Sequence, residues 1–128
     1  MMNRLNISSG APWENTVGYS RAVKIGNLIE VSGTAPVKEG KTFAPGNAYE
    51  QAKCCIQIVE QALKQTGASL KNVIRTRMFV TDISKWEEFG KAHGEFFGEI
   101  KPATSMVEVK SLISSDMLIE IEATALID

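Results

Sequence analysis

The chain has 128 residues, 44% of them apolar, so it is long enough for one domain with a real core and too short for two. Fourteen basic residues against 15 acidic ones argue against a dedicated nucleic-acid binder, which normally carries a basic excess. We find no run of about 18 apolar residues that would span a membrane, and Met1 to Asn6 lack the apolar core of a signal peptide. The sequence therefore predicts one cytoplasmic domain over residues 1–128, with neither nucleic acid nor membrane as partner.

The first elements in chain order are strands. Leu5–Ile7 is a short strand, and a polar loop over Ser8–Asn15 follows it. Tyr19–Ile25 and Leu28–Ser32 read as a hairpin, because Gly26-Asn27 between them is a common two-residue turn.

A helix is predicted from the capping pair Asn47 and Glu50 to about Thr66, and Gly67 is a natural residue to end it. Its apolar residues recur at helical spacing: Ala48, Ala52, Cys55, Val59, Ala62 and Leu63. The adjacent cysteines Cys54 and Cys55 match neither zinc-site nor redox spacing, so we expect reduced thiols in or beside the core.

The second half repeats the alternation of strand and helix. Val73–Thr81 is predicted to be a strand with Ile74, Thr76, Met78 and Val80 on one side and Arg75, Arg77 and Phe79 on the other. Ser84 and Glu87 suggest a second capping box, whose helix would end near Gly98. One side of that helix would carry Trp86, Phe89, His93, Phe96 and Phe97.

Two strands close the chain, Pro102–Val109 and Leu118–Ile127. The last strand carries Ile119, Ile121, Ala123 and Ala125 on its apolar face and Glu120, Glu122 and Thr124 on the other. We expect any chemistry to centre on this strand pair.

The predicted order is β-β-β-α-β-α-β-β, an α+β fold with two helices on one face of a single mixed sheet. The helices leave the second face bare. That face would hold Arg75, Arg77, Phe79, Glu120 and Glu122, which is too rich in aromatic and charged groups for solvation alone. We interpret it as a subunit interface with something bound in it.

Several segments, in this order and spacing, resemble the Rid family (RidA or YjgF type), which has a chorismate-mutase-like fold. They are Gly18-Tyr19-Ser20, Val31-Ser32-Gly33, Phe79-Val80-Thr81-Asp82, Phe96-Phe97, Pro102–Val109 and Ile119–Ala123. The resemblance implies a homotrimer with the bare faces packed together and small-molecule clefts between subunits. It also implies hydrolysis of reactive enamines and imines to 2-keto acids and ammonia, with neither metal nor cofactor.

The resemblance carries over to particular residues. Tyr19 matches the family's cleft tyrosine, Ser32 and Gly33 match the loop that meets the ligand, and Glu120 matches the acidic residue thought to position water. Glu120 is therefore the candidate catalytic residue.

Three positions depart from the deaminating members and suggest a subgroup without the deaminase arginine. Thr104 replaces the arginine of the motif Pro-Ala-Arg-Ser, Met106 replaces a frequent cysteine, and Gly90 aligns with a cleft asparagine. An arginine binds a carboxylate through two charge-assisted hydrogen bonds, each worth about 1.5–3 kcal/mol. Thr104 offers one neutral donor.

Two further residues are candidates for ligand binding. Arg77 lies on the bare face and could receive an anion, or it could pair with Glu120 or Glu122 across the interface. His93 could act as an acid or base at the cleft edge, since histidine titrates near neutral pH, or it could be a hydrogen-bonded residue beside the core.

Three functions remain open from the sequence. The first is a hydrolase acting on an imine or enamine, with Glu120 orienting water. The second is a binding or sensing protein for a small metabolite, which Thr104 favours. The third is RNA cleavage, against which the balanced charge argues.

Overall fold

The computed structural model describes residues 3–128. Met1 and Met2, which open the segment without a signal-peptide pattern, lie outside the described residues. Six strands form the main sheet, in the order β1-β2-β3-β8-β6-β7. They are β1 (Arg4–Ile7), β2 (Ala22–Ile25), β3 (Leu28–Thr34), β6 (Val73–Val80), β7 (Ala103–Glu108) and β8 (Ile119–Leu126). All neighbours are antiparallel except β6 and β7, which are parallel.

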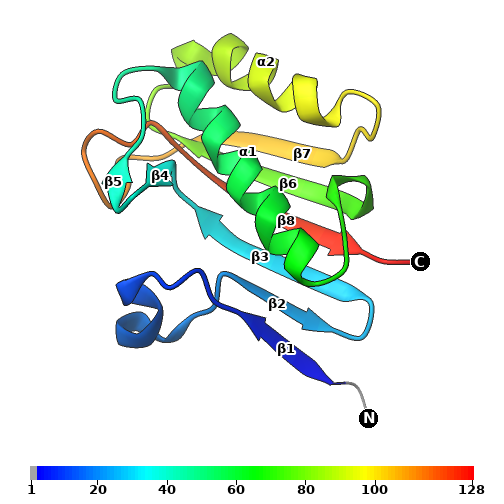
Figure 1. Ribbon diagram of the computed structural model, residues 1–128. Coiled ribbons are helices and arrows are strands. Elements are labelled where there is room, and N and C mark those ends of the chain that lie inside the picture. Colours follow the sequence, from blue (N-terminus) through cyan, green and yellow to red (C-terminus); the bar gives the residue numbers. More distant parts are fainter. Residues whose placement is uncertain (1–2) are drawn as a thin grey trace.

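Two helices, α1 (Ala48–Gln65) and α2 (Trp86–Phe97), lie on the same side of this sheet (Figure 1). Helix α1 crosses β3 and β8 and packs against α2. The predicted α+β class, with two helices on one face of a mixed sheet, is confirmed. We call the opposite side of the sheet, on which no helix of residues 3–128 lies, the open face.

Three short helical turns and a small hairpin complete the described chain. They are η1 (Glu14–Gly18), η2 (Leu70–Asn72), η3 (Ile83–Lys85) and the hairpin of β4 (Val37–Lys38) and β5 (Lys41–Thr42). The sequence did not predict η1 or the hairpin, because two-residue strands and a single helical turn are too short to show periodicity. Within residues 3–128 no helix has the length and apolar character needed to cross a membrane.

Helix α1 forms as its sequence predicts. The Asn47 side chain accepts a hydrogen bond from the backbone N–H of Glu50 at 3.0 Å. At the other end Gly67 has a φ of +88°, and the amides of Gly67 and Ala68 donate back to the carbonyls of Lys64 and Leu63. Every residue of its predicted apolar side is buried, and both cysteines lie in or against the core.

The start of α2 differs from the prediction. Asp82, rather than Ser84, caps the preceding turn by accepting the Ser84 N–H at 3.0 Å, and α2 itself begins at Trp86. Trp86 is 56% exposed, whereas Phe89 is fully buried. The predicted apolar side was wrong at Trp86, because the first residue of the helix projects beyond the sheet-facing stripe.

The helix-facing side of the sheet carries the predicted apolar residues of β6 and β8, with one exception. Thr76, Met78 and Val80 are buried, but Ile74 is 50% exposed. The β6–β8 register shifts between Val73 and Arg75, so Ile74 is an extra, bulged residue and Val73 takes the buried place.

Candidate functional site

The open face carries the charged and aromatic residues that the sequence assigned to it. In the β6–β8 register, Arg77 stands opposite Glu122 and Phe79 stands opposite Glu120. Arg77 and Glu122 form an ion pair of 3.8 Å within one chain, and both side chains are well exposed. Such an exposed pair contributes at most about 1 kcal/mol, so Arg77 keeps freedom to meet another group.

Glu120 lies directly against Gly33. A β-bulge in β3 sets Ser32 and Gly33 opposite the single residue Glu122 of β8, between the pairs Val31–Ala123 and Thr34–Ile121. A Cβ atom at position 33 would stand 2.1 Å from Glu120 Oε1. Only glycine leaves room for the carboxylate in this position.

The charge state of Glu120 follows from that position. Burial raises the pKa of the Glu120 carboxyl, Arg21 works to lower it and Glu122 to raise it, and the pKa is raised overall. A half-buried carboxyl of this kind holds its proton to a higher pH than an ordinary glutamate, as general acids and bases often do.

Arg21 is a site residue that the sequence reasoning missed. Its Nη2 donates to the carbonyl oxygen of Gly33 at 2.6 Å, and its guanidinium carbon lies 5.9 Å from the centre of the Tyr19 ring. Arg21 thus connects Tyr19, Gly33 and Glu120. The signal was available, because Arg21 follows Tyr19 by two residues at the start of an alternating strand.

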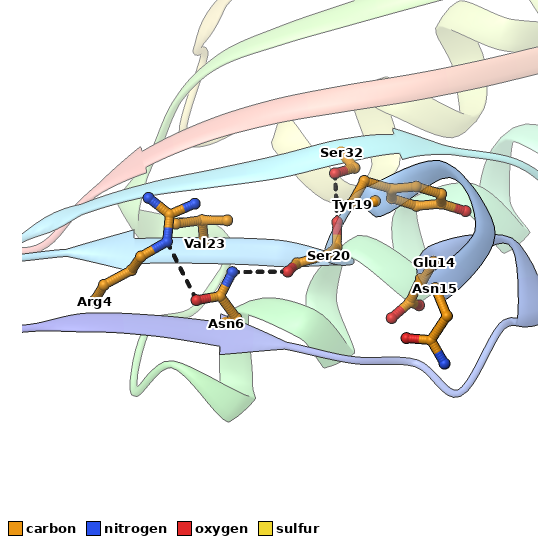
Figure 2. Close-up of a pocket in the computed structure, with 9 residues that line it drawn as sticks. Arg4, Asn6, Glu14, Asn15, Tyr19, Ser20, Val23 and Ser32 are labelled. Atoms are coloured by element: carbon orange, nitrogen blue, oxygen red, sulfur yellow. Dashed lines mark hydrogen bonds between the residues drawn. The ribbon is translucent and has the colours of Figure 1, made fainter.

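Tyr19 and Ser32 line a polar cavity of about 550 Å³ beside the bulge (Figure 2). Its lining also includes Arg4, Asn6, Glu14, Asn15, Gly18, Ser20 and Val23. Ser32 Oγ donates to the carbonyl oxygen of Ser20 at 2.6 Å, and Asn6 Nδ2 donates to Ser20 Oγ at 2.8 Å. A second hollow of about 320 Å³ shares Ser32 and Val23 and reaches Arg77.

Glu14, at the start of η1, adds a second carboxylate to the wall of this cavity. Burial works to raise the pKa of Glu14, but hydrogen bonds from Ser9 and Ser8 outweigh it and the pKa is lowered. Glu14 is therefore ionised at neutral pH. No sequence motif marked it, because the turn that places it is only five residues long.

The remaining candidates lie at the other edge of the sheet. Thr104 and Met106 stand on the edge strand β7, in register with Thr76 and Met78 of β6. Thr104 is exposed and Met106 packs against the core. His93, from α2, reaches down to the sheet and lies 2.8 Å from Thr76 Oγ1 through its Nε2.

The candidate residues thus form two groups. Tyr19, Ser32, Gly33, Arg77 and Glu120 lie together on the open face around β3 and β8, whereas Thr104, Met106 and His93 lie at the β7 edge. The expectation that Pro102–Val109 and Leu118–Ile127 form a strand pair was wrong. Strand β6 lies between β7 and β8 and pairs with both.

Comparison with known proteins agrees with this fold. The sequence model of the family described as endoribonuclease L-PSP matches residues 10–127. The chain belongs to this family, which is also called the YjgF, RutC or Rid family.

Individual Rid-family relatives cover between 84% and 98% of the chain. The Mycobacterium tuberculosis protein Rv2704, a YjgF/YER057c/UK114-family member, has a structure that superposes with a TM-score of 0.90 at 46% identity, covering 98% of this chain and 100% of that one. A RutC family protein of Pyrococcus abyssi is 38% identical over 84% of each chain. Escherichia coli TdcF with bound serine superposes with a TM-score of 0.80 at 25% identity, covering 96% of this chain and 94% of that one.

The polar groups of the site suit an organic ligand. They offer a carboxylate at Glu120, a guanidinium at Arg77, and hydroxyl groups at Tyr19 and Ser32. Among residues 3–128, no three histidine, cysteine, aspartate or glutamate side chains are grouped so that they could hold a metal ion.

Proposed function

We propose that this Rid-family chain hydrolyses an imine or enamine derived from an amino acid, releasing ammonia and a keto acid without a cofactor. The reaction would occur in clefts between the subunits of a homotrimer in the cytoplasm. In each cleft the open-face group around Glu120 from one copy would meet the β7 edge of the next.

One observation carries the proposal, namely the position of Glu120. Its half-buried carboxyl has a raised pKa and lies against Gly33, whose neighbour Ser32 lines the polar cavity. In imine hydrolysis a water oxygen bonds to the imine carbon and the C=N electron pair moves to nitrogen. A proton then reaches the nitrogen as ammonia departs. A half-buried carboxyl with a raised pKa can orient that water and assist these transfers.

The arrangement of the two groups supports an assembly. The group around Glu120 lies on the open face, whereas Thr104 and Met106 lie on the edge strand β7 in register with the helix-facing Thr76 and Met78. A single chain therefore does not bring the two groups into one cleft. The open face also bears Phe79 together with Arg77, Glu120 and Glu122, a mixture typical of a buried or ligand-binding surface. The bound serine of the TdcF relative supports an amino-acid-sized ligand.

The reaction can be tested by measuring ammonia release from an imine generated in place from an amino acid. We expect wild-type protein to exceed buffer, and Glu120→Gln to lower the rate by about 10²–10⁴-fold, the usual contribution of a general acid or base. Glu39→Gln, an exposed glutamate in the turn between β4 and β5, is the matched control and should react as wild type. Equal rates for wild type and Glu120→Gln would refute the proposal.

A second candidate is a protein that binds a small metabolite without converting it. The Thr104 hydroxyl, in place of the expected arginine, bonds to Thr76 and to the carbonyl oxygen of Pro102. It therefore provides no charge for a carboxylate. Under this alternative, thermal-shift screening with amino acids, keto acids and neutral analogues would give a stabilising ligand while no ammonia is released.

RNA cleavage is the third candidate, and the family's name is what raises it. A net charge of −1 disfavours it, because RNA binding depends on basic surface. Incubating a labelled single-stranded RNA with nuclease-free protein and with Glu120→Gln would separate this activity from the hydrolase.

A further inference from the structure

A chain of three polar side chains links the surface of the β7 edge to the interior. Thr76 Oγ1 lies 2.8 Å from His93 Nε2 and 2.8 Å from Thr104 Oγ1. Thr76 has 0% exposure, and Thr104 is exposed. The Thr76 hydroxyl therefore bridges the His93 imidazole, which lies between α2 and the sheet, and the Thr104 hydroxyl at the molecular surface.

Packing alone does not account for this chain. Thr76 faces the helices beside Met78 and Val80, in a layer that is mostly apolar, and valine would fill the same space. A buried hydroxyl costs free energy unless it is hydrogen-bonded, so Thr76 is tolerated because both neighbours bond to it. The His93 ring is held in place by Phe97, whose centre lies 4.6 Å away.

The hydrogen bonds that join the three groups can run in either of two directions. In one arrangement Thr104 donates to Thr76, which donates to His93 Nε2. In the other, His93 donates to Thr76, Thr76 donates to Thr104, and Thr104 donates to the Pro102 carbonyl oxygen at 3.1 Å. Each hydroxyl both donates and accepts, which is the requirement for passing a proton along the chain.

We propose that His93, Thr76 and Thr104 form a proton relay, in which His93 acts as a second base and acid of the reaction, beside Glu120, through the exposed hydroxyl of Thr104. Thr104 is the group that touches the ligand, and Thr76 and His93 act through it. This inference rests on the proposed function, because the ligand reaches Thr104 only if the β7 edge borders the cleft.

The proton balance is simple. As water bonds to the imine carbon it loses a proton to Thr104 Oγ1, Thr104 passes its own proton to Thr76, and Thr76 passes its proton to His93 Nε2. In the same step the Glu120 carboxyl gives its proton to the imine nitrogen. His93 is then an imidazolium. As the C–N bond breaks, His93 returns its proton through Thr76 and Thr104 to the nitrogen, and the Glu120 carboxylate takes the proton of the new hydroxyl group. The products are then the carbonyl compound and ammonia, and both the relay and Glu120 end unchanged.

The resting state of His93 suits the first step. Burial lowers the pKa of His93, so the imidazole is neutral at pH 7 and one ring nitrogen carries a free electron pair. The cost of holding a charge beneath α2 also favours rapid return of the proton.

The relay is tested by kinetics on variants that keep their shape. Thr76→Val removes the middle hydroxyl, and His93→Gln keeps a hydrogen-bonding group that cannot take up a proton. Each should lower kcat about 10²-fold with KM unchanged, and the double variant should be no slower than either one. Thr76→Ser should restore most of kcat.

The wild-type rate in mixtures of H2O and D2O should vary non-linearly with the fraction of D2O, as expected when several protons move together.

Thr66→Val is the matched control. Thr66 is also buried and its hydroxyl bonds only to a backbone carbonyl, that of Leu63 at 2.6 Å. It should lose stability and keep the wild-type kcat. If Thr76→Val does not fold, Thr104→Val at the exposed end of the chain and His93→Gln decide the question.

The outcomes separate the two proposals. If the relay variants match Thr66→Val while Glu120→Gln is inactive, the relay is overturned and the hydrolase stands. If the wild-type protein releases no ammonia from imines, the hydrolase fails and the relay fails with it.

Discussion

At the scale of single residues, the site depends on how closely Glu120 and Gly33 approach each other. The carboxylate occupies the space of the missing side chain, and Arg21, the residue before β2, donates a hydrogen bond to the Gly33 carbonyl oxygen. The position of the carboxylate is therefore set by residues of β3 and β8 and by Arg21, just before β2. Changes at Gly33 or Glu120 should affect the reaction more than the fold.

Gly33→Ala tests that dependence. The new Cβ would meet Oε1 and Cδ of Glu120 at 2.1 and 2.9 Å, which are far atoms of a flexible side chain, so the carboxylate should swing away and the sheet should stay intact. Because a small misplacement of a catalytic group costs up to about 10²-fold, we expect a loss of that order in kcat with a nearly unchanged melting temperature. Gly94→Ala, with open space around its Cβ, is the control in both assays.

The raised pKa of Glu120 predicts a pH-dependent stability. Between the unfolded and the folded pKa, the folded state holds a proton that the unfolded state has lost, so the free energy of unfolding falls as pH rises through this window. The Glu120→Gln variant has no carboxyl to titrate at this position, so its free energy of unfolding does not fall in this way. We expect the variant to melt above wild type at pH 7 and level with it below about pH 4, where the wild-type carboxyl is protonated in both states. A variant that melts below wild type at pH 7 would contradict the raised pKa.

At the scale of elements, features that depend on nearby residues were predicted from the sequence, whereas features that depend on contacts between distant strands were not. Helix α1 was predicted from its cap, its apolar spacing and its terminal glycine, all of which act within a few residues. The bulges in β3 and β6 were not predicted, because a register shift depends on the partner strand β8. The β6 bulge exposes Ile74, and the β3 bulge brings Gly33 to Glu120.

The Asn47 cap offers a test at this scale. Asn47→Ala leaves the Glu50 N–H without its partner and should lower the free energy of unfolding by about 1 kcal/mol. Chemical denaturation would measure it, and Asn47→Asp, which keeps a side-chain acceptor, should remain close to wild type. Since α1 crosses the helix-facing side of the sheet, away from Glu120, we expect kcat to be unchanged in both variants.

At the scale of the whole molecule, the sheet order decides what one chain can do alone. With β6 between β8 and β7, the group around Glu120 and the group around Thr104 lie at separate places in the fold. The proposed homotrimer resolves this separation, because a second copy can supply the missing edge. It would also bury the open face, where Phe79 lies.

The assembly can be measured by light scattering at micromolar concentration. We expect three times the chain mass of 14.0 kDa. Phe79→Asp places a charge on the open face and should lower that mass, whereas Trp86→Gln changes an exposed aromatic residue on α2 and should leave it unchanged. A monomer mass for the wild-type protein would contradict the proposed interface.

The sequence by itself determined the class of the fold, the helices and the sides of most strands, because those features follow from residue spacing along the chain. It also marked Tyr19, Ser32, Gly33 and Glu120 through the family resemblance. Only the tertiary structure decided which strands are neighbours, that the β3 bulge brings Gly33 to Glu120, and that His93 reaches Thr104 through Thr76. Those contacts join residues far apart in the chain, and no local pattern specifies them.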